Sequence, residues 1–193
     1  PDATIFETVE FEYDTLRTRF QQTAFLNKGL RITLRDERPA SAYVVDGEDQ
    51  IARRIQGSEI KLVRAFRAIH RIAPGARILA VDYINVIPRH GCYPTVPASD
   101  EDMRWISTKF RQLNRMIKRA AKRGGAEYVN TFRRTPEGVD LCGDPNVRWA
   151  EVYGPSANDA AVGVPAHPNA AGARGQAAAI LDHIRDTDPD VFR

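Results

Sequence analysis

Apolar runs of strand length alternate along this chain with segments in which apolar residues recur at helical spacing. One such helical segment begins at Ser58, a residue type that caps helix N-termini, and stops at Pro74. Its apolar positions are Leu62, Val63, Phe66 and Ile69. The next segment, Ala76–Pro88, is short, β-branched and almost wholly apolar in its first half, as in a strand buried on both faces of a parallel sheet.

A longer helix is predicted between the acidic start at Ser99 and the glycine pair that begins at Gly124. Its apolar positions are Met103, Ile106, Phe110, Leu113 and Ile117. The pattern then predicts a strand over Ala126–Phe132, a long loop over Arg133–Ala166, and a final helix capped by Asn169. The residues expected to face inward from that helix are Ala177, Ile180, Leu181 and Ile184.

The first quarter of the chain repeats this alternation less regularly. Short strands are predicted over Ala3–Phe6 and Leu30–Leu34, with a helix over Asp14–Gly29 between them. Charged and turn-forming residues fill Arg35–Gly57, which we interpret as a long excursion containing one short strand at Tyr43–Val45.

Strands that alternate with helices predict an α/β fold, a three-layer αβα arrangement with a parallel sheet, because right-handed crossovers place helices on both faces. In such folds ligands bind where loops leave the carboxyl ends of the strands. Two loops therefore matter most. They are Pro88–Ala98, which contains His90 and Cys92, and Arg133–Ala166, which leads into His167.

The composition is that of one globular domain over residues 1–193, with 42% hydrophobic and 27% charged residues. A net charge of +3 does not call for a nucleic-acid partner. The basic residues of the second long helix interleave with its apolar stripe, as on a solvated face. No apolar run approaches the ~20 residues of a membrane span, and the start lacks the features of a signal peptide.

Cys92 and Cys142 each lie in a turn-like setting, where a buried core thiol is not expected. A disulfide between them would close a loop of roughly 50 residues and imply an oxidising compartment, and two free thiols are the alternative. A spacing this wide matches neither a zinc knuckle nor a CxxC redox motif, and Gly-rich phosphate loops are absent from the sequence. We therefore predict no metal and no cofactor.

The strongest local signal is Val164–Gly172, in which His167 stands on a loop immediately before a capped helix. Pro165 and Pro168 restrict the backbone on either side of the histidine, and Asn169 supplies the cap. Small residues after the cap allow the helix to pack close to the sheet. This position suits a general base, although a histidine before a helix is more often an ordinary surface residue.

The Val164–Gly172 segment resembles the last sequence block of the SGNH/GDSL hydrolases, especially the secreted actinobacterial esterases and lipases, in which a His-Pro-Asn-Ala-x-Gly run carries the catalytic histidine. Ile69–Leu79 is similar to that family's passage from helix to strand. The exit of the strand towards Cys92, and the run from Phe132 to Trp149 that contains Cys142, are similar to its disulfide-bearing loops. The resemblance covers about residues 58–185 and leaves the family's N-terminal strand without a counterpart.

The resemblance implies that His167 takes a proton from a serine nucleophile and returns it to the leaving alcohol. Many members place an Asp three residues before the histidine, where this chain has Val164. The Val164 carbonyl, or the carboxylate of Asp159 in the same loop, is then the candidate partner for the imidazole N–H.

The family's Gly-Asp-Ser block does not occur in this sequence. The five serines are Ser41, Ser58, Ser99, Ser107 and Ser156, and none has the strand-to-helix setting of a nucleophile. We expect Pro1–Ile5 to correspond to the lead-in of the family's third block and the nucleophile to precede residue 1. Glu7–Glu10 stands where the family has Gly-x-Asn-Asp, so the oxyanion donor also lacks a counterpart.

Two functions follow from this comparison of residues with the family pattern. The first is a secreted or cell-envelope ester hydrolase that acts on a small-molecule, lipid or glycan ester, with His167 as its general base. The second is an inactive binding or structural module of the same fold, such as one for cell-envelope glycolipid. The sequence leaves the acyl length and the oligomeric state open.

Overall fold

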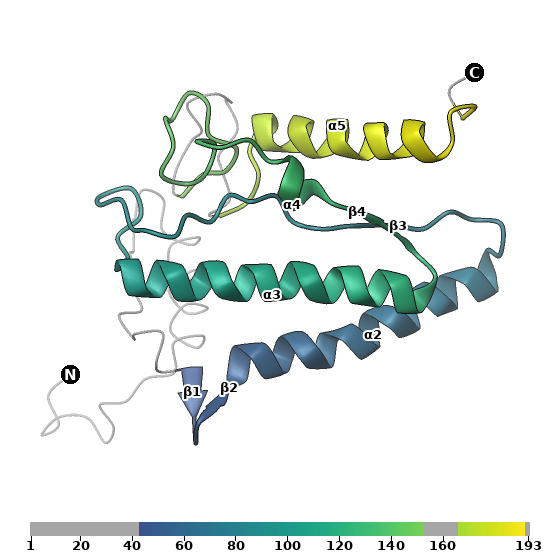
Figure 1. Ribbon diagram of the computed structural model, residues 1–193, viewed down its shortest axis with the longest axis horizontal. Helices are drawn as coiled ribbons and strands as arrows, with labels where there is room; N and C mark the ends of the chain where they lie inside the picture. Colours follow the sequence, from purple (N-terminus) through teal and green to yellow (C-terminus); the bar gives the residue numbers. More distant parts are fainter. Residues whose placement is uncertain (1–42, 153–165, 192–193) are drawn as a thin grey trace, which may run out of the picture. The chain divides into compact units, whose positions relative to one another are not determined.

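The computed structural model describes residues 43–152 and 166–191 of the chain. The chain divides into two compact units, Pro1–Pro39 and Ala40–Arg193, and every described residue belongs to the second. The strands and helix predicted before residue 35 lie outside the described residues. The elements of Figure 1 are, in order, β1 (Val44–Val45), β2 (Glu48–Asp49), α2 (Gln50–Ile72), β3 (Leu79–Val81), α3 (Asp100–Gly124), β4 (Glu127–Val129), α4 (Thr131–Arg134) and α5 (Ala170–Thr187).

The sheet that positions the candidate site consists of β3 and β4, which pair in parallel with Leu79 opposite Glu127 and Val81 opposite Val129. Helices α2 and α3 lie on one side of this pair and α5 lies on the other (Figure 1). The predicted α/β class with three αβα layers is therefore confirmed.

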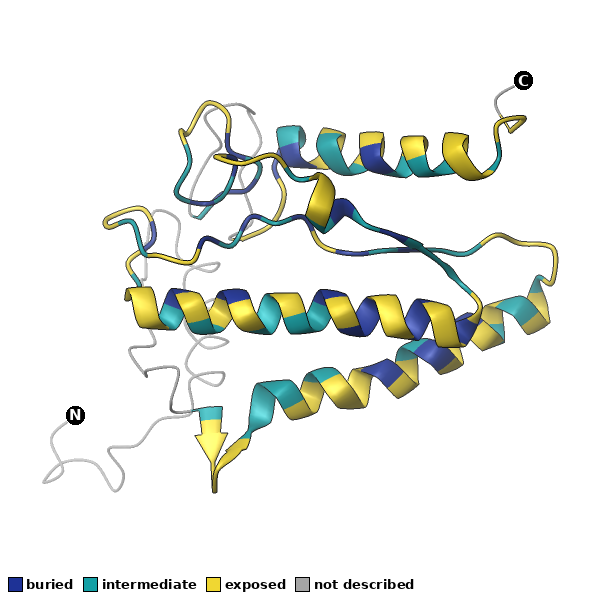
Figure 2. Ribbon diagram, in the orientation of Figure 1, coloured by how far each residue is buried: buried dark blue, intermediate teal, exposed yellow. Residues whose placement is uncertain are grey.

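The main core forms where α2 and α3 pack on β3. Its buried residues are Val63, Phe66, Ala80, Met116, Ile117, Ala120 and Ala121. Buried positions recur along α2 and α3 at the spacing of a helix that covers a sheet with one side (Figure 2). Of the apolar residues predicted to face inward from these helices, Ile69 and Ile106 are exposed, since they lie at the margin of the buried stripe.

Helix α2 begins earlier than predicted. The short strand expected near Tyr43 is confirmed as β1, which pairs with β2 in an antiparallel hairpin. Asp49 then caps α2 by accepting a hydrogen bond of 2.8 Å from the backbone N–H of Ala52. The prediction of Ser58 as the cap is wrong, because Ser58 lies inside the helix and its hydroxyl donates to the Arg54 carbonyl at 2.9 Å.

Both strands of the parallel sheet are shorter than the predicted Ala76–Pro88 and Ala126–Phe132. The Asp82 N–H still donates to the Val129 carbonyl at 3.2 Å, which adds one rung after β3. The Asp82 carboxylate then accepts the backbone N–H of Thr131 at 2.6 Å and begins α4. A side chain thus takes over from the backbone ladder and turns the chain out of the sheet.

Helices α3 and α5 begin at the predicted caps. The Ser99 hydroxyl accepts the N–H of Asp102 at 3.1 Å, and Gly125 ends α3 with a left-handed φ of 81°. Asn169 caps α5. The inward face of α5 is partly wrong, however, because Leu181 is 39% exposed and Ala177 is also exposed. The buried positions are Gly172 and Ala179, while Ile180 and Ile184 are half-buried.

Candidate active site at the start of helix α5

The loops that follow β3 and β4 are joined by a disulfide. Cys92 and Cys142 are bonded, with their Cα atoms 5.8 Å apart, so the predicted bridge is confirmed and the two-thiol alternative is wrong. The Leu141 N–H also donates to the Val86 carbonyl at 3.0 Å, which holds the loops together a second time. A smaller apolar cluster lies beneath them, formed by Ile84, Val86, Val96, Met103, Leu141 and Ala150.

His167 lies where the second loop enters α5, at the carboxyl end of the sheet. Two contacts fix this placement: Ile84, which follows β3, packs on the first turn of α5, and Gln176 reaches the carbonyl of Asp82 at 3.5 Å. The side chain of His167 is exposed. An imidazole held at the sheet's carboxyl end and open to solvent is in a position to exchange a proton with a bound substrate.

The backbone around His167 is held by a short antiparallel ladder with residues 149–151. The His167 carbonyl accepts from the Glu151 N–H at 3.4 Å, and the Ala166 N–H donates to the Glu151 carbonyl at 2.7 Å. The Asn169 N–H donates to the Trp149 carbonyl at 2.9 Å. Ala166 takes a left-handed φ of 59° immediately before the histidine.

Asn169 joins this ladder to the helix. Its Oδ1 accepts the N–H of Gly172 at 3.0 Å, which caps α5. Its Nδ2 donates to the Arg148 carbonyl at 2.8 Å and to Glu151 Oε1 at 2.9 Å. The side chain is buried, so one amide satisfies both the helix end and the loop.

The carboxylate of Glu151 is fully buried and ion-paired with Arg148, which is 9% exposed. Arg148 Nε lies 2.8 Å and Nη2 lies 2.5 Å from Glu151 Oε2. No sequence pattern indicates this pair, because two opposite charges three residues apart in a loop are typical of a solvated surface. Burial is the only signal that distinguishes them.

The small residues of the His167 block have a packing reason. A Cβ at Gly172 would lie 2.2 Å from the Trp149 carbonyl oxygen, and one at Gly175 would lie 2.2 Å from Cη2 of the Trp149 ring. Trp149 therefore packs against α5 as a cover for the loop. Trp105, the other tryptophan, stacks on Tyr43 with ring centroids 5.5 Å apart.

A second buried carboxylate, that of Asp82, follows β3, and the sequence pattern does not single it out. It accepts from the Tyr128 hydroxyl and from the backbone N–H groups of Thr131 and Phe132. Burial, followed by the bond to Asp82, raises the pKa of Tyr128 above its ordinary value. All these donors come from β4 and α4, so Asp82 fixes the carboxyl end of the sheet.

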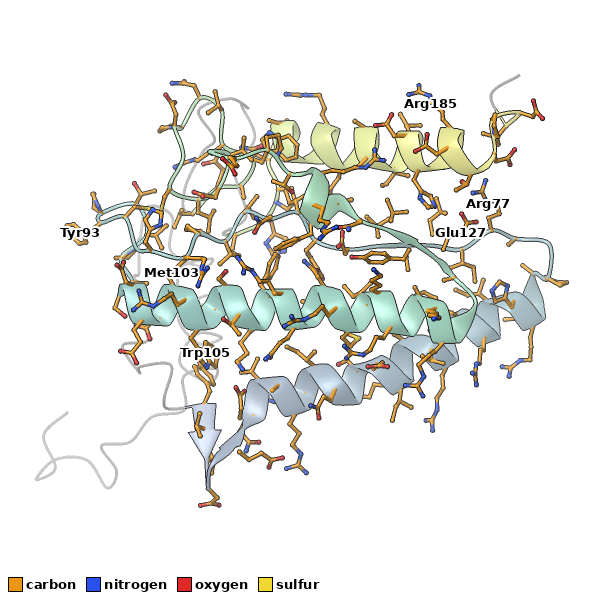
Figure 3. The ribbon with its side chains drawn as sticks, viewed as in Figure 1. Arg77, Tyr93, Met103, Trp105, Glu127 and Arg185 are labelled. Atoms are coloured by element: carbon orange, nitrogen blue, oxygen red, sulfur yellow. A yellow bond between two sulfur atoms is a disulfide. The ribbon has the colours of Figure 1, made fainter. Side chains whose placement is uncertain are left out.

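The opposite end of the sheet carries an ionic cluster in which Arg77 and Glu127 face one another near the end of α5 (Figure 3). Arg77 donates to both carboxylate oxygens of Glu127, at 2.8 and 2.7 Å. His183 lies 3.1 Å from the same carboxylate. Chiefly because of the bonds from Arg77, the pKa of Glu127 falls from 4.5 to about 2.

The structure places no predicted partner of His167. Asp159 and Val164 lie outside the described residues, as do Ser41 and Ser156. Of the remaining serines, Ser58 lies inside α2, Ser99 caps α3 and Ser107 is buried in α3. A serine beside the imidazole, and a group to orient it, therefore stay predictions.

The other function classes considered from the sequence find little support in residues 43–152 and 166–191. Arg119 and Arg123 of the basic stretch both bind Glu59, at 2.8 Å each, so part of that stretch is engaged in an internal ion pair. Within those two ranges no three acidic, His or Cys side chains are grouped to hold a metal ion. None of the described helices is long and apolar enough to cross a bilayer.

A family model described as the GDSL-like lipase/acylhydrolase family matches residues 17–174, more than three quarters of the chain. The chain belongs to this family. The membership expected from the His167 block is thereby confirmed.

Named relatives of the GDSL family agree with that assignment. Lipase 2 of Streptomyces coelicolor is 32% identical over 126 residues, which are 63% of this chain and 40% of that lipase. Phospholipase A1 from Streptomyces albidoflavus NA297 has the same fold, with a TM-score of 0.51 and 17% identity over 75% of this chain and 61% of that one. The chain thus spans less than two thirds of either protein.

A shorter match of a different kind accompanies these. A DNA gyrase polypeptide of Micrococcus luteus is 69% identical over 49 residues, which are 25% of this chain and 7% of the gyrase polypeptide. A match to so small a part of that polypeptide assigns no gyrase activity to this GDSL-family chain.

Proposed function

We propose that this GDSL-family chain serves in carboxylic ester hydrolysis, with His167 as the general base. The observation that supports the proposal is the exposed imidazole of His167 on a backbone fixed at the carboxyl end of a parallel sheet. Residue type, position and family agree on this role. A base fixed by the backbone can meet a nucleophile repeatedly in one geometry.

In the proposed reaction, His167 accepts the proton of a serine hydroxyl as the serine oxygen attacks the ester carbonyl. The C–O bond to the alcohol breaks, the imidazolium returns the proton to that alcohol, and an acyl-enzyme remains. Water then attacks the acyl carbonyl, His167 takes its proton and gives it back to the serine oxygen, and the acid leaves. The described serines have structural roles, so the proposal requires a serine outside the described residues.

The imidazole N–H that does not face the serine needs an acceptor. The carbonyl of Val164 and the carboxylate of Asp159 are the two acceptors that we propose, because both belong to the loop that leads into His167. A carboxylate there would stabilise the imidazolium more than a carbonyl would.

We assign the substrate to esters of acyl lipids or of acylated polysaccharide, and the chain to the cell exterior or envelope. The names of Lipase 2 and phospholipase A1 support a lipid ester. The Cys92–Cys142 disulfide supports an oxidising compartment.

The test is hydrolysis of p-nitrophenyl acetate and butyrate by the full chain, by His167→Ala and by His90→Ala. His90 is a matched control because it is an exposed histidine on the neighbouring loop. Loss of a general base lowers kcat by about 10²–10⁴-fold. We expect that loss in His167→Ala alone, and equal activity of parent and His167→Ala would refute the assignment.

The second candidate is a non-catalytic binding module, which the absence of a Gly-Asp-Ser run from the sequence favours. A serine-reactive phosphonate followed by peptide mapping separates the two functions. Labelling of one serine, abolished by prior denaturation, supports the hydrolase and names its nucleophile. No labelling together with no hydrolysis supports the binding module.

A further inference from the structure

The segment that carries His167 rests on a buried ionic group that the proposed reaction does not itself use. Glu151 is completely buried, yet its charge is met by Arg148 on one carboxylate oxygen and by Asn169 on the other. Burying two charges costs nearly as much free energy as their attraction returns, so such a pair is a weak source of stability. A role in fixing geometry explains its position better.

We infer that Glu151 is the positioning residue of the candidate site, acting through the backbone of His167 and the side chain of Asn169. The inference rests on the proposed role of His167 as a base. Glu151 contacts both ends of the histidine segment: its own N–H and C=O bond to His167 and Ala166, and its carboxylate holds the amide of Asn169.

The geometry makes these contacts interdependent. The backbone bonds of Glu151 set the path of the chain before the histidine, and Asn169 sets it after the histidine by capping α5 at the N–H of Gly172. Arg148 in turn neutralises the carboxylate and offers its carbonyl to Asn169. Loosening the carboxylate therefore frees the segment on both sides of the imidazole.

Two variants test this inference against one control. Glu151→Gln removes the charge and turns an amide towards Arg148. Asn169→Ser keeps a good helix cap but removes the two Nδ2 donors, so it separates capping from positioning even where Glu151→Gln folds poorly. Glu59→Gln is the control, because Glu59 is also a buried carboxylate clamped by arginines, Arg119 and Arg123, between α2 and α3.

Amide hydrogen exchange is the first measurement, because it needs no turnover. The informative amides are those of Ala166 and Asn169, which donate to residues 151 and 149, and α3 reports global opening. In Glu151→Gln and Asn169→Ser we expect these two amides to exchange at least about tenfold faster relative to α3 than in the parent. In Glu59→Gln the ratio should stay at the parental value. An even increase across the chain in all three variants, or parental exchange in Asn169→Ser, would overturn the inference.

Kinetics on p-nitrophenyl butyrate give the second measurement. Misplacing a catalytic group by about 1 Å costs up to about 10²-fold in rate, so we expect kcat to fall about 10–100-fold with KM within about twofold in both site variants. Glu59→Gln should keep the parental kcat, and a matching fall in that variant would contradict a positioning role. Activity that survives His167→Ala would refute the hydrolase proposal alone, since the exchange result stands without it.

Discussion

Gly172, in the first turn of α5, offers the sharpest test of the packing beneath His167. In Gly172→Ala the new Cβ would lie 2.2 Å from the Trp149 carbonyl oxygen, below the 3.0 Å that real Cβ atoms approach, and 3.2 Å from Cδ1 of Ile84. The Trp149 carbonyl is backbone and already accepts the N–H of Asn169. Relief of the clash therefore strains the ladder that holds the histidine.

The expected magnitude is a balance of two effects. Alanine favours a helix over glycine by about 1 kcal/mol, whereas overpacking a filled site costs typically about 1–3 kcal/mol and sometimes more. A clash with backbone falls at the costly end, so we expect Gly172→Ala to lose about 1–3 kcal/mol net of unfolding free energy. For a chain of this size each kcal/mol lowers Tm by roughly 2–4 °C.

Gly57→Ala is the matched control, because Gly57 lies within α2 and a Cβ there would meet no atom within 4 Å. It should gain about 0.5–1 kcal/mol. Urea unfolding followed by circular dichroism measures both variants. If Gly172→Ala proves as stable as Gly57→Ala, the close approach of Trp149 to α5 is refuted.

Three further predictions concern the rest of the described fold. Replacing Cys92 and Cys142 by serine should lower the unfolding free energy by about 4 kcal/mol, the chain-entropy value for a 50-residue loop, and urea unfolding that shows no loss would contradict it. Because the pKa of Glu127 is lowered from 4.5 to about 2, its stabilisation is present above pH 4.5 and disappears as the pH falls towards 2; the stability difference between parent and Glu127→Gln should shrink over that interval, and a difference independent of pH would be inconsistent with the bond. Asp49→Ala should cost about 0.5–2 kcal/mol and Ser58→Ala close to nothing in thermal unfolding, with the opposite order restoring the cap expected from the sequence.

Local chemistry determines the parts of this fold that the sequence predicts well. Ser99 and Gly125 mark the limits of α3 because a cap hydroxyl and a left-handed glycine act within a few residues. The same holds for Asn169 at α5. The start of α2 is harder to predict because two residue types suitable as caps, Asp49 and Ser58, stand at either end of a charged stretch, and packing against α3 decides between them.

Long-range contacts determine what the sequence leaves open at the candidate site. The histidine block is recognisable through the spacing of His167, Asn169 and Gly172. Burial of Arg148 and Glu151 depends on residues brought together only by folding, so no pattern in the loop distinguishes them from surface charges. Asp82 is similar, since it interrupts an apolar run and only the donors of β4 and α4 make its burial acceptable.

The left-handed backbone of Ala166 limits which residues can replace it. An L-residue with a Cβ loses roughly 1–2 kcal/mol in that conformation, and β-branched residues lose more. A library randomised at codon 166 and selected for folding should therefore return Gly, Asn and Asp and discard Val, Ile and Thr. The residue next to the histidine would then tolerate changes in polarity far better than changes in shape.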